Sequence, residues 1–179
     1  AGRTAWIRAG EEAMERILVS ACLLGRAVRF DGRAKTINHE IVARWRDEGR
    51  LVPFCPEVVG GLPVPRPPAE IEGAQGARAV LAGQARIRTR DGRDVTAFFL
   101  HGAQAALRAA QEHGVRLAVL KEKSPSCGVH QVFDGSFTGT TVPGMGLTTL
   151  LLRDHGIDVF TEHELPQAQA RLTELETSR

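Results

Sequence analysis

The sequence predicts an α/β fold: a single domain with a mainly parallel sheet flanked by helices in a Rossmann-like, three-layer arrangement. Short apolar runs rich in β-branched residues alternate along the chain with segments of helical periodicity, and this alternation is typical of βαβ units. At 179 residues, the chain has the length of one ordinary domain and can bury a substantial core without a staple.

Four of the apolar runs are expected to form the strands of the parallel sheet. They lie at residues 16–21, 51–54, 116–121 and 157–160. Each run is short and rich in the aliphatic residues that strands prefer.

Two segments between these runs have the spacing of amphipathic helices. NHEIVARWRDEG has Asn38 as its expected N-cap and Gly49 as its stop. VTAFFLHGAQAALRAAQEHG has Thr96 as its expected N-cap and Gly114 as its stop. We expect both segments to be crossover helices between parallel strands.

Proline and glycine mark a hairpin and long loops, which we expect at the active-site edge of the sheet. Residues 62–77 hold too many prolines for a regular helix or a central strand. Residues 79–95 have hairpin character, with Asp91-Gly92 as a turn. A further loop, FDGSFTGTTVPGMG, is expected to lead into a helix that begins near residues 144–148.

The charge pattern argues against polymeric partners. The net charge is +2, both signs are mixed, and there is no long Lys/Arg block, so we expect no extensive nucleic-acid surface. No stretch approaches the ~18 uninterrupted apolar residues of a membrane helix, and no secretion signal is visible. We therefore expect a cytoplasmic protein without a membrane partner.

The sequence changes character at Met14. The string MERILVSACLLG has the character of a natural start, preceded by a polar stretch. We interpret residues 1–13 as an N-terminal leader or extension and residues 14–179 as the catalytic domain.

The three cysteines are candidates for one shared metal or cluster site. Cys22 and Cys55 each follow a predicted strand, and Cys127 lies a few residues after the third one. The carboxyl ends of parallel strands share one edge of the sheet, where ligands bind. Thiolates select zinc, copper(I) or iron–sulfur centres, and three of them leave a fourth position for a substrate. An ordinary role in the core is the alternative for any single cysteine.

A Cys₃His zinc site is the rival interpretation. His130 lies three residues after Cys127 and could complete such a site. The C-x₂-C spacing that makes zinc assignments specific is absent. Spacing alone therefore leaves the metal open.

Five strings resemble the motifs of a bacterial family that was first catalogued as a domain of unknown function and whose characterised members are 2-thiouracil desulfidases. They are ILVSACLLG, VRFDG, VPFCPEVVGGLPVPRPPAEI, LKEKSPSCG and DGSFTGT, and the match runs from about Arg16 to Leu165. The resemblance implies a [4Fe–4S] cluster held by Cys22, Cys55 and Cys127, with the fourth iron free of protein ligands.

The resemblance also implies that Glu57 and Ser124 take part in catalysis. An undercoordinated iron is a Lewis acid that can accept the sulfur of a thiocarbonyl. Glu57 suits the role of general base for the attacking water, and Ser124 suits that of a hydroxyl that orients the ring or relays a proton. Oxygen would replace sulfur on the base, and sulfide would leave without net redox change.

Five further residues are candidates for contact with the substrate, each with an alternative. Ser126 competes with its neighbour for the role of catalytic serine. Arg66 and Glu70 would close over the substrate, or form a structural ion pair with each other. Asp31 and Asp134 each precede a glycine and are first of all turn formers.

The predicted function is therefore iron–sulfur-dependent, non-redox desulfidation of a thiolated pyrimidine or a related thionated nucleobase. The predicted partner is this small molecule. Two alternatives stay open: a sulfur-transfer partner protein or an enzyme of thiolated RNA, and a non-catalytic zinc module. The sequence makes no prediction of oligomeric state.

Overall fold

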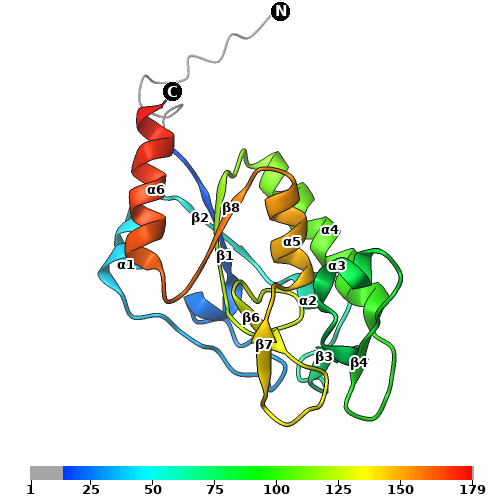
Figure 1. Ribbon diagram of the computed structural model, residues 1–179. Coiled ribbons are helices and arrows are strands. Elements are labelled where there is room, and N and C mark those ends of the chain that lie inside the picture. Colours follow the sequence, from blue (N-terminus) through cyan, green and yellow to red (C-terminus); the bar gives the residue numbers. More distant parts are fainter. Residues whose placement is uncertain (1–13, 179) are drawn as a thin grey trace, which may run out of the picture.

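A four-stranded parallel sheet forms the centre of the protein in a computed structural model that describes residues 14–178 (Figure 1). The strand order is β2-β1-β5-β8, with β1 (Ile17–Ser20), β2 (Leu51–Phe54), β5 (Leu117–Leu120) and β8 (Asp158–Thr161). The α/β class and the parallel sheet are confirmed, and each strand lies within one residue of its predicted position. The predicted leader, residues 1–13, lies outside the described residues.

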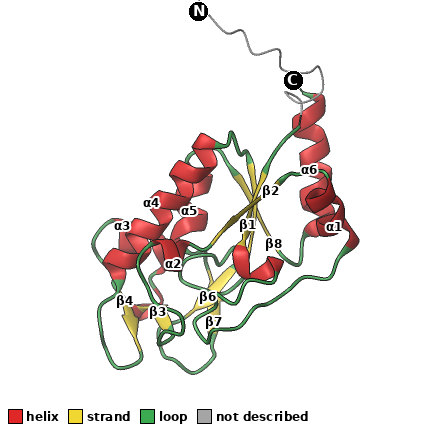
Figure 2. Ribbon diagram, turned by 180° about the vertical axis from the view of Figure 1, so that it is seen from behind, coloured by secondary structure: helices red, strands yellow, loops and turns green. Residues whose placement is uncertain are grey.

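Alternate residues of the strands face two different helical layers, as the pleat of a strand dictates. Ile17 and Val19 pack with Trp45 in the core beneath α1 (Glu40–Asp47) and α6 (Leu165–Thr177). Leu18 faces the opposite core, beneath α4 (Thr96–Glu112) and α5 (Leu147–Asp154). Figure 2 shows the two helical layers on either side of the sheet. The predicted three-layer arrangement follows from this alternation.

Both predicted N-caps are wrong by one residue, although both predicted stops are right. His39 caps α1, because its Nδ1 accepts the backbone N–H of Ile41 at 3.0 Å. Thr96 is the first residue of α4, and its hydroxyl accepts the N–H of Ile87 at 2.9 Å instead of capping the helix. Gly49 and Gly114 follow the two helices in the left-handed conformation that suits a stop.

Four short strands form two antiparallel pairs outside the central sheet. β3 (Ala69–Ile71) pairs antiparallel with β4 (Ile87–Thr89), and β6 (Gln131–Phe133) pairs with β7 (Thr141–Pro143). Between β3 and β4 lie η2 (Glu72–Ala74) and α3 (Gly76–Leu81). The predicted hairpin at 79–95 is wrong in its first part, which is helical. Its second part is right: Arg88 and Asp94 form an antiparallel bridge across the predicted Asp91-Gly92 turn, and β4 pairs with β3 as well.

Two short helical elements begin at the carboxyl ends of β1 and β2, and each contains or adjoins a cysteine. η1 (Ala21–Leu24) follows β1, and α2 (Pro56–Val59) follows β2. α2 packs directly against the backbone of α4, since a Cβ on Gly102 would lie 2.0 Å from the carbonyl oxygen of Pro56. α6 is not among the predicted elements.

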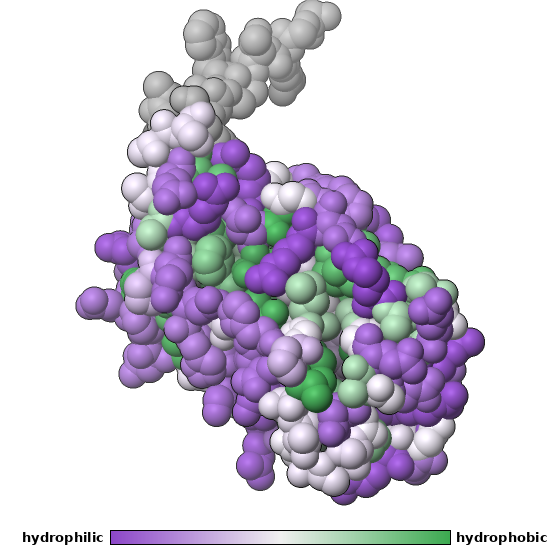
Figure 3. Space-filling view, viewed as in Figure 1, coloured by the Kyte–Doolittle hydropathy of each residue, from purple (hydrophilic) through white to green (hydrophobic). Residues whose placement is uncertain are grey.

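The surface carries few large apolar side chains. The face shown in Figure 3 is largely hydrophilic, with apolar residues gathered toward its middle. Over residues 14–178, no helix combines the length and the apolar character that crossing a membrane requires.

Candidate functional site

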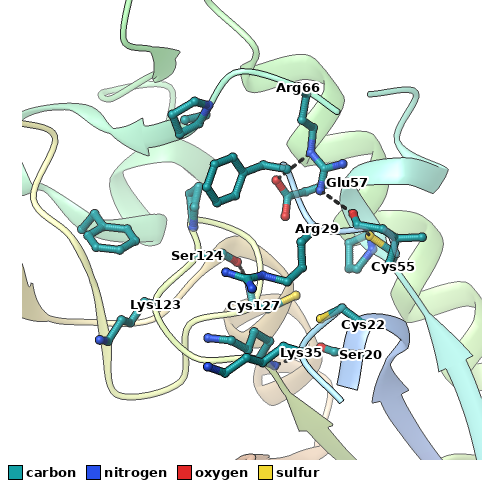
Figure 4. A pocket seen from close by; sticks show the side chains of 18 of the residues that line it. Ser20, Cys22, Arg29, Lys35, Cys55, Glu57, Arg66, Lys123, Ser124 and Cys127 are labelled. Carbon is teal, nitrogen blue, oxygen red and sulfur yellow. Dashed lines mark hydrogen bonds and ion pairs between the residues drawn. The ribbon is translucent and has the colours of Figure 1, made fainter. Parts of the chain in front are cut away.

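The three cysteines meet at the carboxyl edge of the sheet. Cys22 lies in η1 directly after β1, Cys55 lies between β2 and α2, and Cys127 lies in the loop after β5. The strand order reverses between β1 and β5, and ligands of parallel sheets bind at such a switch point. All three cysteines line one cavity of about 740 Å³ (Figure 4).

Burial disfavours the charged form of all three thiols. Loss of water around the sulfur raises the pKa of Cys22 to about 11 and also raises the pKa of Cys55 and of Cys127. The nearby charges of Lys121 and Arg29 oppose this shift in the pKa of Cys22. A metal centre would supply the positive charge that three thiolates need.

The cavity offers three soft thiols as potential metal ligands, and His130 does not lie with them. Tetrahedral zinc, with Zn–S bonds of about 2.3 Å, needs its thiolates within about 4 Å of one another. Within residues 14–178, no three His, Cys, Asp or Glu side chains are grouped closely enough to bind one metal ion. His130 is absent from the described wall of the cavity, and its exposed ring pairs with Glu164 at 2.9 Å. These observations do not favour the Cys₃His alternative, and the chemistry of three thiols suits a soft metal centre such as an iron–sulfur cluster.

Glu57 faces the same cavity from the first turn of α2. Its side chain is 18% exposed and contacts Arg66 at 3.4 Å between Oε1 and Nε. Burial raises the pKa of the Glu57 carboxyl, and the guanidinium of Arg66 opposes the shift. Arg66 also donates to the carbonyl oxygens of Val28 and Pro63, so it holds Glu57 against the surrounding loops.

The two candidate serines have different surroundings. Ser124 lines the cavity, and its Oγ accepts the backbone N–H of Cys127 at 2.8 Å. This contact leaves the hydroxyl proton of Ser124 available to a ligand. Ser126 is buried, lies 2.9 Å from the hydroxyl of Thr148, and is 3.7 Å from the sulfur of Cys127. The structure therefore brings Ser124, but not Ser126, to the cavity wall.

A buried carboxylate that the sequence analysis did not single out shapes the Cys127 loop. Glu122 is 4% exposed, and its Oε1 accepts the backbone N–H of Val129 at 2.6 Å and that of His130 at 3.1 Å. The same oxygen accepts from Lys123 at 3.2 Å. These contacts close the loop between β5 and β6 around one side chain. The polarity of KEKSPS gave no reason to expect burial there.

Comparison with known proteins identifies the family. Residues 17–164 match the family model described as 2-thiouracil desulfurase. The chain belongs to this family. It is 42% identical over 149 residues to YbbK of Bacillus subtilis (strain 168), an uncharacterised protein, a match that spans 83% of this chain and 97% of YbbK.

A solved structure of another protein shares most of this architecture. It is that of the [4Fe–4S]-dependent thiouracil desulfidase TudS (DUF523Vcz), which is 48% identical. The TM-score is 0.81, and the match covers 89% of this chain and 98% of TudS. The sequence pattern, the structure and this relative therefore agree on the fold.

Of the four remaining candidate residues, two line the cavity. Arg66 and Glu70 both line it, but the alternative of an ion pair between them is not met in the described part of the chain, because Arg66 pairs with Glu57. In the described part of the chain, Asp31 and Asp134 do not line the cavity. The carboxylate of Asp31 accepts the backbone N–H of Arg33 instead. Their positions are those of turn formers.

Asp134 shapes the loop between β6 and β7. Its carboxylate accepts the N–H and the hydroxyl of Ser136, and these hydrogen bonds lower the pKa of Asp134. The cavity also has cations that sequence reasoning did not single out, Arg29, Lys35 and Lys123. Only the tertiary contact of distant loops gathers them.

Proposed function

We propose that this protein is an enzyme that replaces the sulfur of a thiolated pyrimidine, such as 2-thiouracil, with oxygen from water. The reaction takes up one water, forms a C=O bond in place of C=S, and releases hydrogen sulfide without net electron transfer. The observation that carries the proposal is that three thiols from three strand ends share one cavity with the partly buried carboxylate of Glu57. The 48% identity to TudS supports it.

In this proposal, Cys22, Cys55 and Cys127 hold a [4Fe–4S] cluster and leave one iron without a protein ligand. When bound, the cluster supplies a Lewis acid for the sulfur of the substrate. Binding requires the three thiols to lose their protons. Lys121 and Arg29 assist that loss at Cys22, since their charges oppose the rise in its pKa that burial causes.

Glu57 is the proposed general base. It lies two residues after Cys55 and faces the same cavity, so it can take a proton from a water that attacks the ring carbon. Arg66 restrains the carboxylate, which limits the orientations it can adopt. The partly buried position would also strengthen a hydrogen bond from that water, because less solvent competes there than at the surface.

Ser124 is the proposed substrate-orienting group. Its oxygen is engaged by the N–H of Cys127, so the hydroxyl proton is directed away from that amide. A ring oxygen or nitrogen in the cavity can accept this proton. We assign the activity to residues 14–179 and to the cytoplasm, where cysteines stay reduced.

Anaerobic reconstitution tests the proposal. The protein is loaded with iron and sulfide, its iron content and visible absorption are measured, and sulfide and uracil released from 2-thiouracil are quantified. We expect brown protein with about four irons per chain and stoichiometric release of both products. A zinc-loaded sample is the matched control and should be inactive. Loaded protein that leaves 2-thiouracil and its ring analogues unchanged would overturn the proposed function.

A further inference from the structure

Aromatic side chains gather in the wall of the cavity. Four of the seven phenylalanines of the chain line it: Phe30, Phe54, Phe133 and Phe137. Phe137 is half-buried, and within residues 14–178 it belongs to none of the three buried apolar clusters. A ring that faces a cavity instead of a core is available to a flat ligand.

Phe137 has a backbone conformation that a bulky residue rarely adopts. Its φ is 58°, in the left-handed region that favours glycine and asparagine. Residues held in this region persist only when their surroundings impose it, and they concentrate at ligand sites. The guanidinium of Arg90 lies 5.8 Å from the centroid of the ring, which adds a cation–π contact at the cavity wall.

Glu70 imposes this conformation from β3. Its carboxylate is buried, and Oε1 accepts the N–H of Gly135 at 2.9 Å and that of Phe137 at 3.2 Å. The loop also lies directly on β3, since a Cβ on Gly135 would come within 2.7 Å of the carbonyl oxygen of Ile71. Glu70 thus holds the loop between β6 and β7 against β3 at the position of Phe137.

We propose that Phe137 is the ring-contact residue of the site and stacks on the flat heterocycle of the thiolated base, and that Glu70 is its positioning residue. This inference rests on the proposed function and adds a source of specificity to it. Stacking recognises a planar ring through its face, whichever atom carries the sulfur. The residue therefore selects for ring shape, while the thiols and Glu57 act on the C–S bond.

Phe137→Asn separates this role from a structural one. Asparagine tolerates the left-handed backbone, so the thermal midpoint should stay at the parent value or rise. Loss of stacking should weaken binding of 2-thiouracil and of uracil to the reconstituted enzyme by roughly 5- to 150-fold, measured by calorimetry. In turnover, KM should rise by more than kcat falls. Phe137→Leu, which keeps apolar area but no aromatic face, should weaken binding less.

Phe98 offers a matched control, because it is also half-buried and the guanidinium carbon of Arg93 lies 5.9 Å from its ring centroid. Unlike Phe137, it is absent from the described cavity wall. Phe98→Leu should bind both ligands as the parent does. A Phe137→Asn enzyme with parent affinity for both ligands would overturn the inference while the parent still turned over, leaving the proposed function intact. Parent enzyme that binds neither ligand would overturn both.

Glu70 is tested by comparing two variants. Glu70→Gln keeps an oxygen that can accept both N–H groups and should retain the parent KM, whereas Glu70→Ala loses both contacts and should raise KM with iron content unchanged. Calorimetric binding of uracil should change in parallel with KM. An alanine variant with parent KM and parent uracil affinity would remove Glu70 from the role of positioning residue.

Discussion

Cys55 and Glu57 lie two residues apart and face the same cavity, yet their proposed roles separate experimentally. Cys55→Ser replaces a soft thiolate with a poor ligand, so bound iron and turnover should both fall. Glu57→Gln is nearly isosteric and leaves the thiols in place, so iron should stay while turnover falls roughly 10²- to 10⁴-fold.

Iron analysis and sulfide release from 2-thiouracil check both variants together. Full iron content in Cys55→Ser would contradict the three-thiolate proposal. Parent turnover in an iron-loaded Glu57→Gln enzyme would remove Glu57 from the mechanism.

Glu122 illustrates how a single buried acceptor can hold a loop. Glu122→Ala leaves the N–H groups of Val129 and His130 without their acceptor, and we expect a loss of at least about 2 kcal/mol in the free energy of unfolding. Glu122→Gln retains Oε1 and should lose less. Urea unfolding of the two apo-proteins measures the difference, and equal stability of the alanine variant and the parent would be inconsistent with this role.

At the scale of elements, the contact between α2 and α4 determines where Glu57 lies. Helix propensity alone favours Gly102→Ala by about 1 kcal/mol. The space at this position has the opposite effect, because the new Cβ would lie 2.0 Å from the carbonyl oxygen of Pro56. Overpacking costs about 1–3 kcal/mol and displaces backbone, so the clash should dominate.

We therefore expect Gly102→Ala to lower the thermal midpoint and, by moving α2, to lower turnover. Gly114→Ala is a useful comparison, since it is strained by its φ of 64° but has no atom near its Cβ position and lies far along the chain from α2. It should lower stability with kcat retained. An unchanged thermal midpoint in Gly102→Ala would show that the two helices can separate without loss.

For the whole molecule, the proposed cluster joins the ends of three strands. A group that binds the folded protein but not the unfolded chain raises stability. The reconstituted protein should have a higher thermal midpoint than the apo-protein, and chelation of iron should reverse the gain. In Cys22→Ser the two midpoints should coincide, and a persistent difference would place the iron elsewhere.

Removal of residues 1–13 should leave both the fold and the activity unchanged. β1 begins at Ile17, and every proposed site residue follows it. Circular dichroism, thermal unfolding and sulfide release of the shortened protein provide the test. A truncated protein without a cooperative transition would contradict the assignment of the domain to residues 14–179.

The sequence by itself was sufficient for the parallel sheet and for the gathering of the three cysteines. Both follow from local properties: apolar runs of strand length, and a topology that places the ends of parallel strands at one edge. The apolar spacing of Leu165, Ala168, Leu172 and Leu175 could also have indicated α6, which was not predicted.

Only the tertiary structure decided what surrounds the thiols. β3 is three residues long and pairs with β4 across an intervening helix, so no local pattern could reveal it. Arg66 contacts Glu57 instead of Glu70, and Ser126 faces Thr148 instead of the cavity, because packing of distant segments sets the direction of each side chain. The left-handed Phe137 depends on a carboxylate 67 residues earlier in the chain. Contacts of this kind are not encoded in neighbouring residues, and they exist only once the loops have closed over the sheet.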